Sequence, residues 1–302
     1  VPLGAAVSWS RFRGDDALEA LFLREFDSVT PENEMKMAFL QPRRGEFTFG
    51  AADALVRFAT LRGKRVRGHT LVWHQQNPAW LTHGSWTEEE LEEVLSDHVR
   101  TVVGHFRGRV DTWDVVNEPL DLDGSLRAGG APWAPVLGRG YIETALRAAR
   151  AADPEAKLFI NEIAAEHGGP KLDALVALAA DLKARGVPLD GIGLQNHTTV
   201  TSFPSRERLA DAIARFAALG LEVEITEMDV ATSTGSGSLG ERLVRQGDAY
   251  RAAAAACRAN AACTGITVWG LADHLSWLGA EEHALPFDAT LAPKPAWYGL
   301  SG

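Results

Sequence analysis

Residues 110–121 read VDTWDVVNEPLD. The middle of this stretch alternates and then runs apolar from Trp113 to Val116, which is typical of a buried β-strand. The run stops at Asn117 and Glu118, and Pro119 follows, which cannot extend a strand ladder. The sequence here predicts a buried strand that carries an amide and a carboxylate at its end.

Seven other short runs of β-branched or apolar residues occur along the chain. Each is followed by polar residues and then by an amphipathic helical pattern. The eight runs are residues 3–9, 26–31, 64–73, 110–118, 157–162, 191–197, 221–229 and 265–273. Eight strand-then-helix units with strands too apolar to face water predict an α/β fold, a (β/α)8 TIM barrel. A doubly wound open sheet is the alternative, but no G-x-G-x-x-G follows the first run and no P-loop is present.

The helical patterns also carry start signals. Thr87 and Glu90 stand at the start of the pattern that leads to the fourth run, with the spacing of a capping box. We therefore expect a helix that begins at Thr87.

Composition limits the organisation and the partners of the chain. It has 302 residues, 46% of them hydrophobic, and no linker or low-complexity tract divides it, so we expect one domain over residues 1–302. The formal net charge of −10, with no basic cluster, argues against a nucleic-acid partner. No apolar run approaches the roughly 18 residues that a membrane helix needs, and no signal-peptide pattern opens the chain, so we expect a soluble protein from which any signal peptide is already absent.

The spacing of the histidines and cysteines bears on metal binding and on the redox compartment. His69 and His74 are not spaced as H-E-x-x-H, and we expect neither a metal nor a cofactor. Cys257 and Cys263 are the only cysteines. Their spacing fits two buried free thiols or a local disulfide, of which only the disulfide implies an oxidising compartment.

Polar and aromatic residues stand at the ends of the predicted strands. In a (β/α)8 barrel these ends form the active-site face, so we expect the side chains to converge on one cleft. They are Glu32, Asn33, Lys36, His69, Trp73, His74, Asn117, Glu118, Asn161, Glu162, Gln195, His197, Glu227, Trp269 and Asp273. Amides, carboxylates and cations match the hydroxyl groups of a sugar, and indole rings match its apolar faces. The set predicts a carbohydrate cleft.

Glu118 and Glu227 are the pair that could cleave a glycosidic bond, which requires one protonated and one ionised carboxyl group. They end the fourth and seventh runs of an eight-membered ring, so we expect them to face each other. His197 on the neighbouring strand could hydrogen-bond Glu227 and keep it ionised as the nucleophile, which leaves Glu118 as the proton donor. Because side chains alternate along a strand, Asn117 and Glu118 both enter the cleft only if the strand bends there.

Five motifs together resemble glycoside hydrolase family 10, the endo-β-1,4-xylanases, over residues 3 to 299. They are TPENEMK, RGHTLVWH, WDVVNEP, ITEMD and TVWGLADHLSW, in the order that the family uses. The resemblance implies a retaining mechanism with Glu118 as acid/base and Glu227 as nucleophile. It implies that Asn117 binds the sugar 2-hydroxyl, and that His197 and Gln195 orient the nucleophile.

The resemblance also assigns substrate contacts and a location. Polar residues would bind the sugars on the non-reducing side, and three tryptophans would form the walls of that part of the cleft. The substrate-binding set is Glu32, Asn33, Lys36, His69, Trp73, Gln76, Asn161, Trp269 and Trp277. The family's cysteine spacing implies a Cys257–Cys263 disulfide and hence secretion. We expect a monomer that acts on xylan or xylo-oligosaccharides.

The chain departs from the family pattern at two places. Met37 stands where the family usually has Trp, and Glu162-Ile163 stand where it usually has Asp-Tyr after Asn161. The missing Tyr would stack on the leaving-side sugar, a contact worth about 0.5–1.5 kcal/mol. An alternative hypothesis is therefore a retaining β-glycosidase that acts on aryl or small-molecule glycosides. A catalytically inactive sugar-binding barrel would predict loss of a carboxylate, and both carboxylates are present.

Overall fold

A computed structural model describes residues 1–302, which form two compact units. Unit 1 consists of Val1–Thr30, Ile163–Gly169 and Leu194–Gly302. Unit 2 consists of Pro31–Glu162 and Pro170–Gly193. The chain thus passes from one unit to the other four times, and neither unit is one continuous segment.

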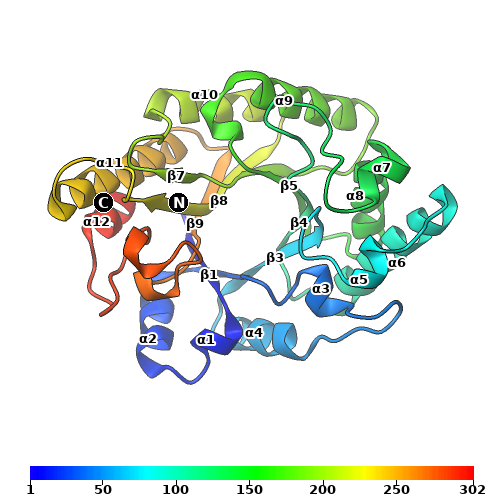
Figure 1. The fold of residues 1–302 in the computed structure, drawn as a ribbon, viewed down its shortest axis with the longest axis horizontal. Coiled ribbons are helices and arrows are strands. Elements are labelled where there is room, and N and C mark those ends of the chain that lie inside the picture. Colours follow the sequence, from blue (N-terminus) through cyan, green and yellow to red (C-terminus); the bar gives the residue numbers. More distant parts are fainter. The chain divides into compact units, whose positions relative to one another are not determined.

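Unit 2 is built on consecutive strands in the order β6-β5-β4-β3, of which β3–β4 and β4–β5 pair in parallel. The strands are β3 (Arg65–Val72), β4 (Thr112–Asn117), β5 (Lys157–Glu162) and β6 (Gly191–Leu194). The helices are α3 (Met37–Leu40), α4 (Gly50–Thr60), α5 (Ala79–Thr82), α6 (Glu88–Phe106), α7 (Trp133–Leu137), α8 (Gly140–Ala152) and α9 (Gly169–Ala184). Helices α4, α6 and α8 contact these strands and α6 packs on α8 (Figure 1).

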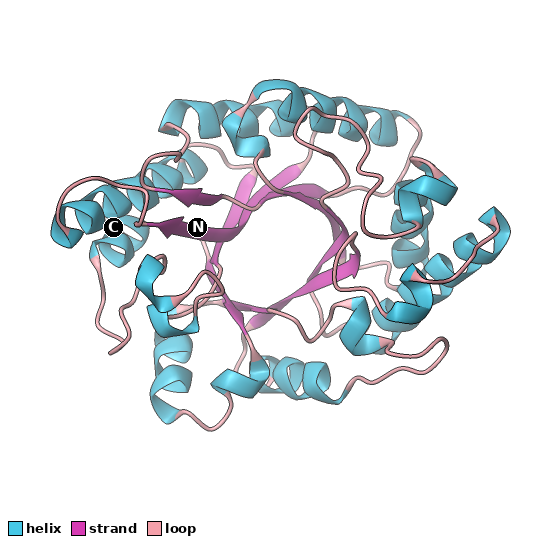
Figure 2. Cartoon of the chain, viewed as in Figure 1, coloured by secondary structure: helices cyan, strands magenta, loops and turns pink.

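Unit 1 holds the remaining strands in the order β2-β1-β9-β8-β7, with parallel pairs β1–β9, β8–β9 and β7–β8. The strands are β1 (Leu3–Val7), β2 (Ser28–Pro31), β7 (His197–Thr199), β8 (Glu222–Ala231) and β9 (Cys263–Val268). The helices are α1 (Trp9–Phe12), α2 (Asp16–Glu25), α10 (Arg206–Ala217), α11 (Leu239–Arg258) and α12 (Pro295–Ser301), with short 3-10 helices η1 (Ala165–His167), η2 (Asp273–Leu275) and η3 (Ala280–Glu282). Figure 2 shows α11 beside β8 and β9.

Each of the eight predicted runs contains a strand, but the sixth run is not one strand. Residues 191–197 divide into β6 and the start of β7, because Asn196 adopts a left-handed backbone with φ of +63°. Asn tolerates this conformation better than most residues, and a left-handed residue cannot continue a strand. The prediction of a continuous strand over residues 191–197 is therefore wrong.

Glycines on the strands of unit 2 make room for large aromatic rings. A Cβ on Gly68 of β3 would lie 2.2 Å from the indole of Trp113 on β4, and one on Gly191 of β6 would lie 2.3 Å from the ring of Phe159 on β5. Both rings are completely buried. Small and large residues thus interlock between neighbouring strands, as close packing of a core requires.

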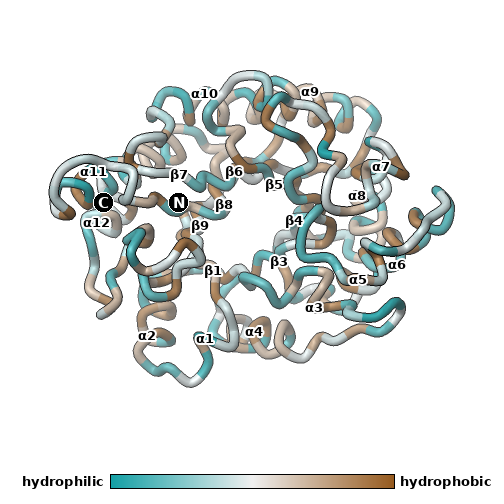
Figure 3. The backbone as a smooth tube through the Cα atoms, in the orientation of Figure 1, coloured by the Kyte–Doolittle hydropathy of each residue, from teal (hydrophilic) through white to brown (hydrophobic).

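The helices follow the predicted amphipathic patterns. The side chain of Thr87 accepts from the Glu90 amide, and the side chain of Glu90 accepts from the Thr87 amide. The predicted capping box at the start of α6 is thus confirmed. Leu91, Leu95 and Val99 of this helix are fully buried at four-residue spacing. Figure 3 shows hydrophilic and hydrophobic residues alternating along α10 in the same manner.

The two cysteines form a disulfide between Cys257, near the end of α11, and Cys263, the first residue of β9. Of the two states that the spacing allows, the structure has the local disulfide, as the family resemblance implies. No helix of the chain combines the length and apolar composition needed to cross a membrane.

Candidate active site

Glu118 follows β4 directly and has a left-handed backbone with φ of +53°. Its amide donates to the carbonyl of Asn161 at the end of β5, at 2.8 Å. The predicted bend at the end of the fourth run is thus confirmed. It turns two consecutive residues, Asn117 and Glu118, so that their side chains lie together.

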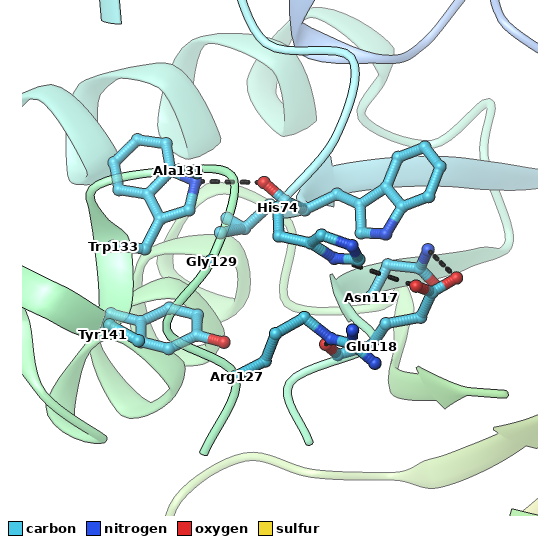
Figure 4. Close-up of a pocket in the computed structure, with 11 residues that line it drawn as sticks. His74, Asn117, Glu118, Arg127, Gly129, Ala131, Trp133 and Tyr141 are labelled. Atoms are coloured by element: carbon cyan, nitrogen blue, oxygen red, sulfur yellow. Dashed lines mark hydrogen bonds and ion pairs between the residues drawn. The ribbon is translucent and has the colours of Figure 1, made fainter. Parts of the chain in front are cut away.

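The carboxyl group of Glu118 lies beside two uncharged groups. The Nδ2 atom of Asn117 is 3.5 Å from Glu118 Oε1, and the Nδ1 atom of His74 is 3.7 Å from Oε2 (Figure 4). Burial lowers the pKa of His74 and outweighs the opposite effect of Glu118, so its ring is neutral at neutral pH. Asn117 is itself held by Asn161, whose amide donates to Asn117 Oδ1 at 2.8 Å.

A pocket opens beside Glu118 within unit 2. Its lining includes Val72, His74, Glu118, Arg127, Trp133 and Tyr141. Figure 4 shows the guanidinium of Arg127 at the backbone carbonyl of Glu118, with Tyr141 and Trp133 to the left of Arg127. Burial raises the pKa of Tyr141, so its hydroxyl stays protonated and can donate a hydrogen bond.

Most of the predicted substrate-binding residues of unit 2 form one hydrogen-bonded cluster. Asn33 Oδ1 accepts from Lys36 Nζ at 3.2 Å and from Gln76 Nε2 at 3.1 Å, and Asn33 Nδ2 donates to Glu32 at 3.3 Å. The Lys36 ammonium lies 5.0 Å from the ring centre of Trp73. The structure therefore brings these five residues together, and their hydrogen-bond donors and acceptors could bind sugar hydroxyl groups beside the indole face of Trp73.

His69 and Asn161 are buried strand residues that are fixed by their neighbours. His69 Nδ1 lies 3.0 Å from Asp114 Oδ2, and Arg67 pairs with the same carboxylate. Burial would raise the pKa of Asp114, but Arg67 and His69 outweigh it and lower that pKa. The ionised Asp114 thus orients the imidazole of His69 through Nδ1.

Glu227 lies on β8 in unit 1 and is paired with His197 on β7. His197 Nε2 lies 3.1 Å from Glu227 Oε2, as predicted, and the Glu227 amide donates to the Gln195 carbonyl at 3.0 Å. The other ring nitrogen, His197 Nδ1, lies 2.9 Å from Asp229 Oδ2. One imidazole thus links two carboxylates.

The charge on this imidazole decides the state of Glu227. Burial would lower the pKa of His197, but Asp229 and then Glu227 outweigh it and raise the pKa well above 6.5. A positively charged His197 in contact with Glu227 favours the ionised carboxylate. The contact with His197 thus holds the Glu227 carboxylate in a fixed orientation.

Two predicted tryptophan walls surround His197. The ring centres of Trp269 and Trp277 lie 6.1 and 5.3 Å from that of His197. Trp269 is nearly buried, whereas 55% of Trp277 is exposed. The indole of Trp277 donates to Asp229 Oδ2 at 2.8 Å, so this wall residue is tied to the partner of His197.

The two departures from the family pattern in unit 2 are both buried. Met37 is 3% exposed, and Glu162 is fully enclosed, where it forms an ion pair with Lys171 at 2.8 Å. The prediction that Glu162 lies in the cleft is therefore wrong, because its side chain is buried in this ion pair at the end of β5. No group of three or more His, Cys, Asp and Glu side chains is placed to hold a metal ion.

Comparison with known proteins agrees with these motifs. The sequence profile described as glycosyl hydrolase family 10 matches residues 1–301. The chain belongs to glycosyl hydrolase family 10. An endo-1,4-beta-xylanase of Agaricus bisporus is 40% identical over 280 residues, which cover 91% of this chain and 82% of that protein. As a member of family 10, the chain is a glycoside hydrolase.

Solved structures of the family give the fold. Native xylanase 10B from Thermotoga maritima matches with a TM-score of 0.94 and 38% identity, over 100% of this chain and 94% of that one. Xylanase 10B from Thermotoga petrophila RKU-1, determined in complex with xylobiose, matches with a TM-score of 0.93 and 38% identity, over 100% and 93% of the two chains. The predicted (β/α)8 barrel is thereby confirmed.

Sequence reasoning missed several residues that hold the family 10 site. Asp229 could have been found, since it lies two positions after Glu227 and a strand places such residues on one face. Arg127 carries no such signal, because its partners are backbone carbonyls of a loop. Glu162 was predicted as a polar residue at the end of the fifth run, but its ion pair with Lys171 was not. That Glu118 and Glu227 flank one cleft, and the roles given to each site residue, stay predictions.

Proposed function

We propose that the chain is a retaining endo-β-1,4-xylanase that hydrolyses internal bonds of xylan. The observation that carries the proposal is His197, which contacts Glu227 and is held in its charged form by Asp229. A carboxylate kept ionised and oriented in this way fits a nucleophile rather than a proton donor. Relatives and structural neighbours named as xylanases support xylan as the substrate.

In the first step Glu118 gives its proton to the glycosidic oxygen while a Glu227 oxygen attacks the anomeric carbon. The glycosidic bond breaks, the leaving sugar departs with the proton, and a covalent glycosyl-enzyme remains. In the second step the ionised Glu118 removes a proton from water, and the water oxygen displaces Glu227 from the anomeric carbon. Two inversions give net retention of configuration.

The surrounding residues have separate tasks in this scheme. Asn117, fixed by Asn161, is placed next to Glu118 and would bind the sugar 2-hydroxyl. Gln195 and His197 orient Glu227. Glu32, Asn33, Lys36, Trp73 and Gln76, together with His69, would bind xylose units on the non-reducing side, with Trp269 and Trp277 as walls.

The test is the stereochemistry and range of hydrolysis. Proton NMR of early products from xylohexaose should show the β-anomer first, and the α-anomer first would contradict retention. Xylan hydrolysis should exceed the hydrolysis of aryl cellobiosides. Rapid aryl cleavage without xylan cleavage would favour the small-molecule glycosidase, which Met37 and Ile163 suggest.

The acid role is tested by Glu118→Ala. Without a proton donor, kcat/KM should fall by about 100-fold or more on xylo-oligosaccharides and far less on dinitrophenyl xylobioside, whose phenolate leaves without protonation. Glu227→Gln should lose activity on both substrates. Equal losses for Glu118→Ala on the two substrates would remove Glu118 from the acid role.

We further propose that the protein is secreted and monomeric. The Cys257–Cys263 disulfide supports an oxidising compartment. Light scattering after size-exclusion chromatography should give the mass of one chain, 32.6 kDa. Recovery of the protein from the culture medium of its natural host, rather than from its cells, tests secretion.

A further inference from the structure

Glu118 depends on a short backbone segment in an unfavourable conformation. A left-handed backbone at a residue with a Cβ costs about 1–2 kcal/mol and persists only where neighbouring groups hold it. Glu118 has φ of +53°, and the next two residues, Pro119 and Leu120, lead into a loop that doubles back, with Leu120 bridged to Leu126. The question is what holds residues 118–120 in place.

Every polar backbone group of residues 118–120 has a partner. The Glu118 amide bonds to Asn161, and the Pro119 carbonyl accepts from the Arg127 amide at 2.8 Å. The Glu118 and Leu120 carbonyls accept from Arg127 Nε and Nη2, at 3.0 and 2.9 Å. The Leu120 amide donates to Glu162 Oε2 at 3.1 Å. Two side chains, those of Arg127 and Glu162, supply three of these five bonds.

Both side chains are themselves fixed by charge. The second oxygen of Glu162 lies 2.8 Å from the Lys171 ammonium at the start of α9, and both residues are almost completely buried. Arg127 Nη1 lies 3.0 Å from Asp121, inside the same loop. A buried ion pair adds little to stability as such, but it restricts the position of each partner. The Glu162 oxygen that accepts from the Leu120 amide is therefore fixed in position by Lys171.

We propose that Arg127 and the Glu162–Lys171 pair are positioning residues that aim the carboxyl group of Glu118 at the glycosidic oxygen. The proposal rests on the acid/base role proposed for Glu118 and adds residues that act on it through the backbone of residues 118–120. It assigns a task to Glu162, one of the two positions in unit 2 where this chain departs from its family. General acid catalysis needs the donor within hydrogen-bond distance, so a displaced loop impairs protonation most.

The experiment compares two double variants that differ only at position 162, where one has a hydrogen-bond acceptor and the other has none. Glu162→Leu with Lys171→Met removes the acceptor for the Leu120 amide without leaving a buried charge unpaired. Glu162→Gln with Lys171→Met also removes both charges but keeps an oxygen that can accept that bond. We expect the first to lose about tenfold in kcat/KM on xylo-oligosaccharides and little on dinitrophenyl xylobioside, and the second to stay near wild type on both.

A further variant covers the case in which the leucine variant does not fold. Arg127→Lys keeps the positive charge but lacks the planar guanidinium that reaches the Glu118 and Leu120 carbonyls from two separate nitrogens, and it should show the same selective loss on xylo-oligosaccharides. Equal losses on the two substrates, or no loss, in the variants that fold would overturn the proposal. Glu118→Ala serves as the reference: if its own loss is not selective, the acid role fails, and if only the positioning variants lack selectivity, this inference fails alone.

Discussion

Asp229 raises the pKa of His197, the residue that contacts the proposed nucleophile Glu227. Its Oδ2 atom receives both His197 Nδ1 and the indole of Trp277. We predict that Asp229→Asn lowers the pKa of His197, because the largest effect that raises it is lost. Dinitrophenyl xylobioside does not need the proton of Glu118, so with this substrate the alkaline limb of the kcat/KM profile should follow deprotonation of His197 and move to lower pH.

The control for this change is Asp97→Asn on α6, since Asp97 has an exposed side chain far along the helix from the capping box. That variant should keep the wild-type profile. Nitrogen chemical shifts of the His197 ring report the same pKa directly. An unchanged profile and unchanged ring shifts in Asp229→Asn would show that Asp229 does not hold the proton on His197.

The residues at strand ends, including the contact of His197 with Glu227, were predictable, whereas the loop residue Arg127 was not. Glu118 and Glu227 are readable because a polar residue interrupts an apolar run at a place that the barrel assigns to chemistry. Arg127 binds the carbonyl groups of residues 118–120, which precede it by seven to nine positions. The loop conformation that brings them together leaves no periodic pattern in the sequence. The bend at Glu118 was predictable from the need to turn two neighbours to one side.

Helix α6 carries a buried histidine that should make the fold sensitive to acid. His98 Nδ1 lies 2.9 Å from Gln41 Oε1, and burial lowers the pKa of His98 to about 4. The unfolded chain binds a proton at this residue near pH 6.5, so stability is lost as pH falls from about 6.5 to about 4. The loss is on the order of 3 kcal/mol from this one residue.

His98→Gln tests this contribution, because a glutamine amide can still donate to Gln41 and does not titrate. We predict that the difference in free energy of unfolding between pH 7 and pH 4.5, from urea titrations, is smaller in the variant than in the wild type. A variant with the same pH dependence as the wild type would mean that other groups cause the acid sensitivity.

The start of α6 offers a second prediction at the level of one element. Thr87→Ala removes the side-chain acceptor for the Glu90 amide and should cost about 1 kcal/mol of stability in urea unfolding at pH 7. Ser85→Ala is the matched control, an exposed hydroxyl two residues earlier that caps no helix. Equal effects of the two substitutions would show that the box does not stabilise the helix.

Element boundaries were less predictable than element order. The sixth run reads as one strand because Ile192 and Leu194 are apolar and β-branched residues follow it at Thr198 and Thr199. The polar pair Gln195-Asn196 inside it was the available signal, and the left-handed Asn196 ends β6 there. Local propensity does not distinguish a polar strand tip from a break when the next residues pair again, as His197 does with Asp229.

At the scale of the molecule, the division into two units bears on how the chain unfolds. Unit 1 needs three separate segments and unit 2 needs two, so each unit can form only when distant parts of the chain come together. Bringing segment ends together carries a loop-closure cost that grows with the length between them. Ile163–Gly169 is too short to carry a core of its own. We therefore expect that neither unit is stable while the other is unfolded.

This expectation agrees with the single domain predicted for residues 1–302 and is testable by calorimetry. One transition should appear, with a calorimetric enthalpy equal to the van't Hoff enthalpy. Near-ultraviolet circular dichroism, which reports the tryptophans of both units, should follow the same curve as far-ultraviolet dichroism. Two resolved transitions, or a protease-resistant fragment that corresponds to one unit, would show that the chain folds as two domains and would refute the prediction.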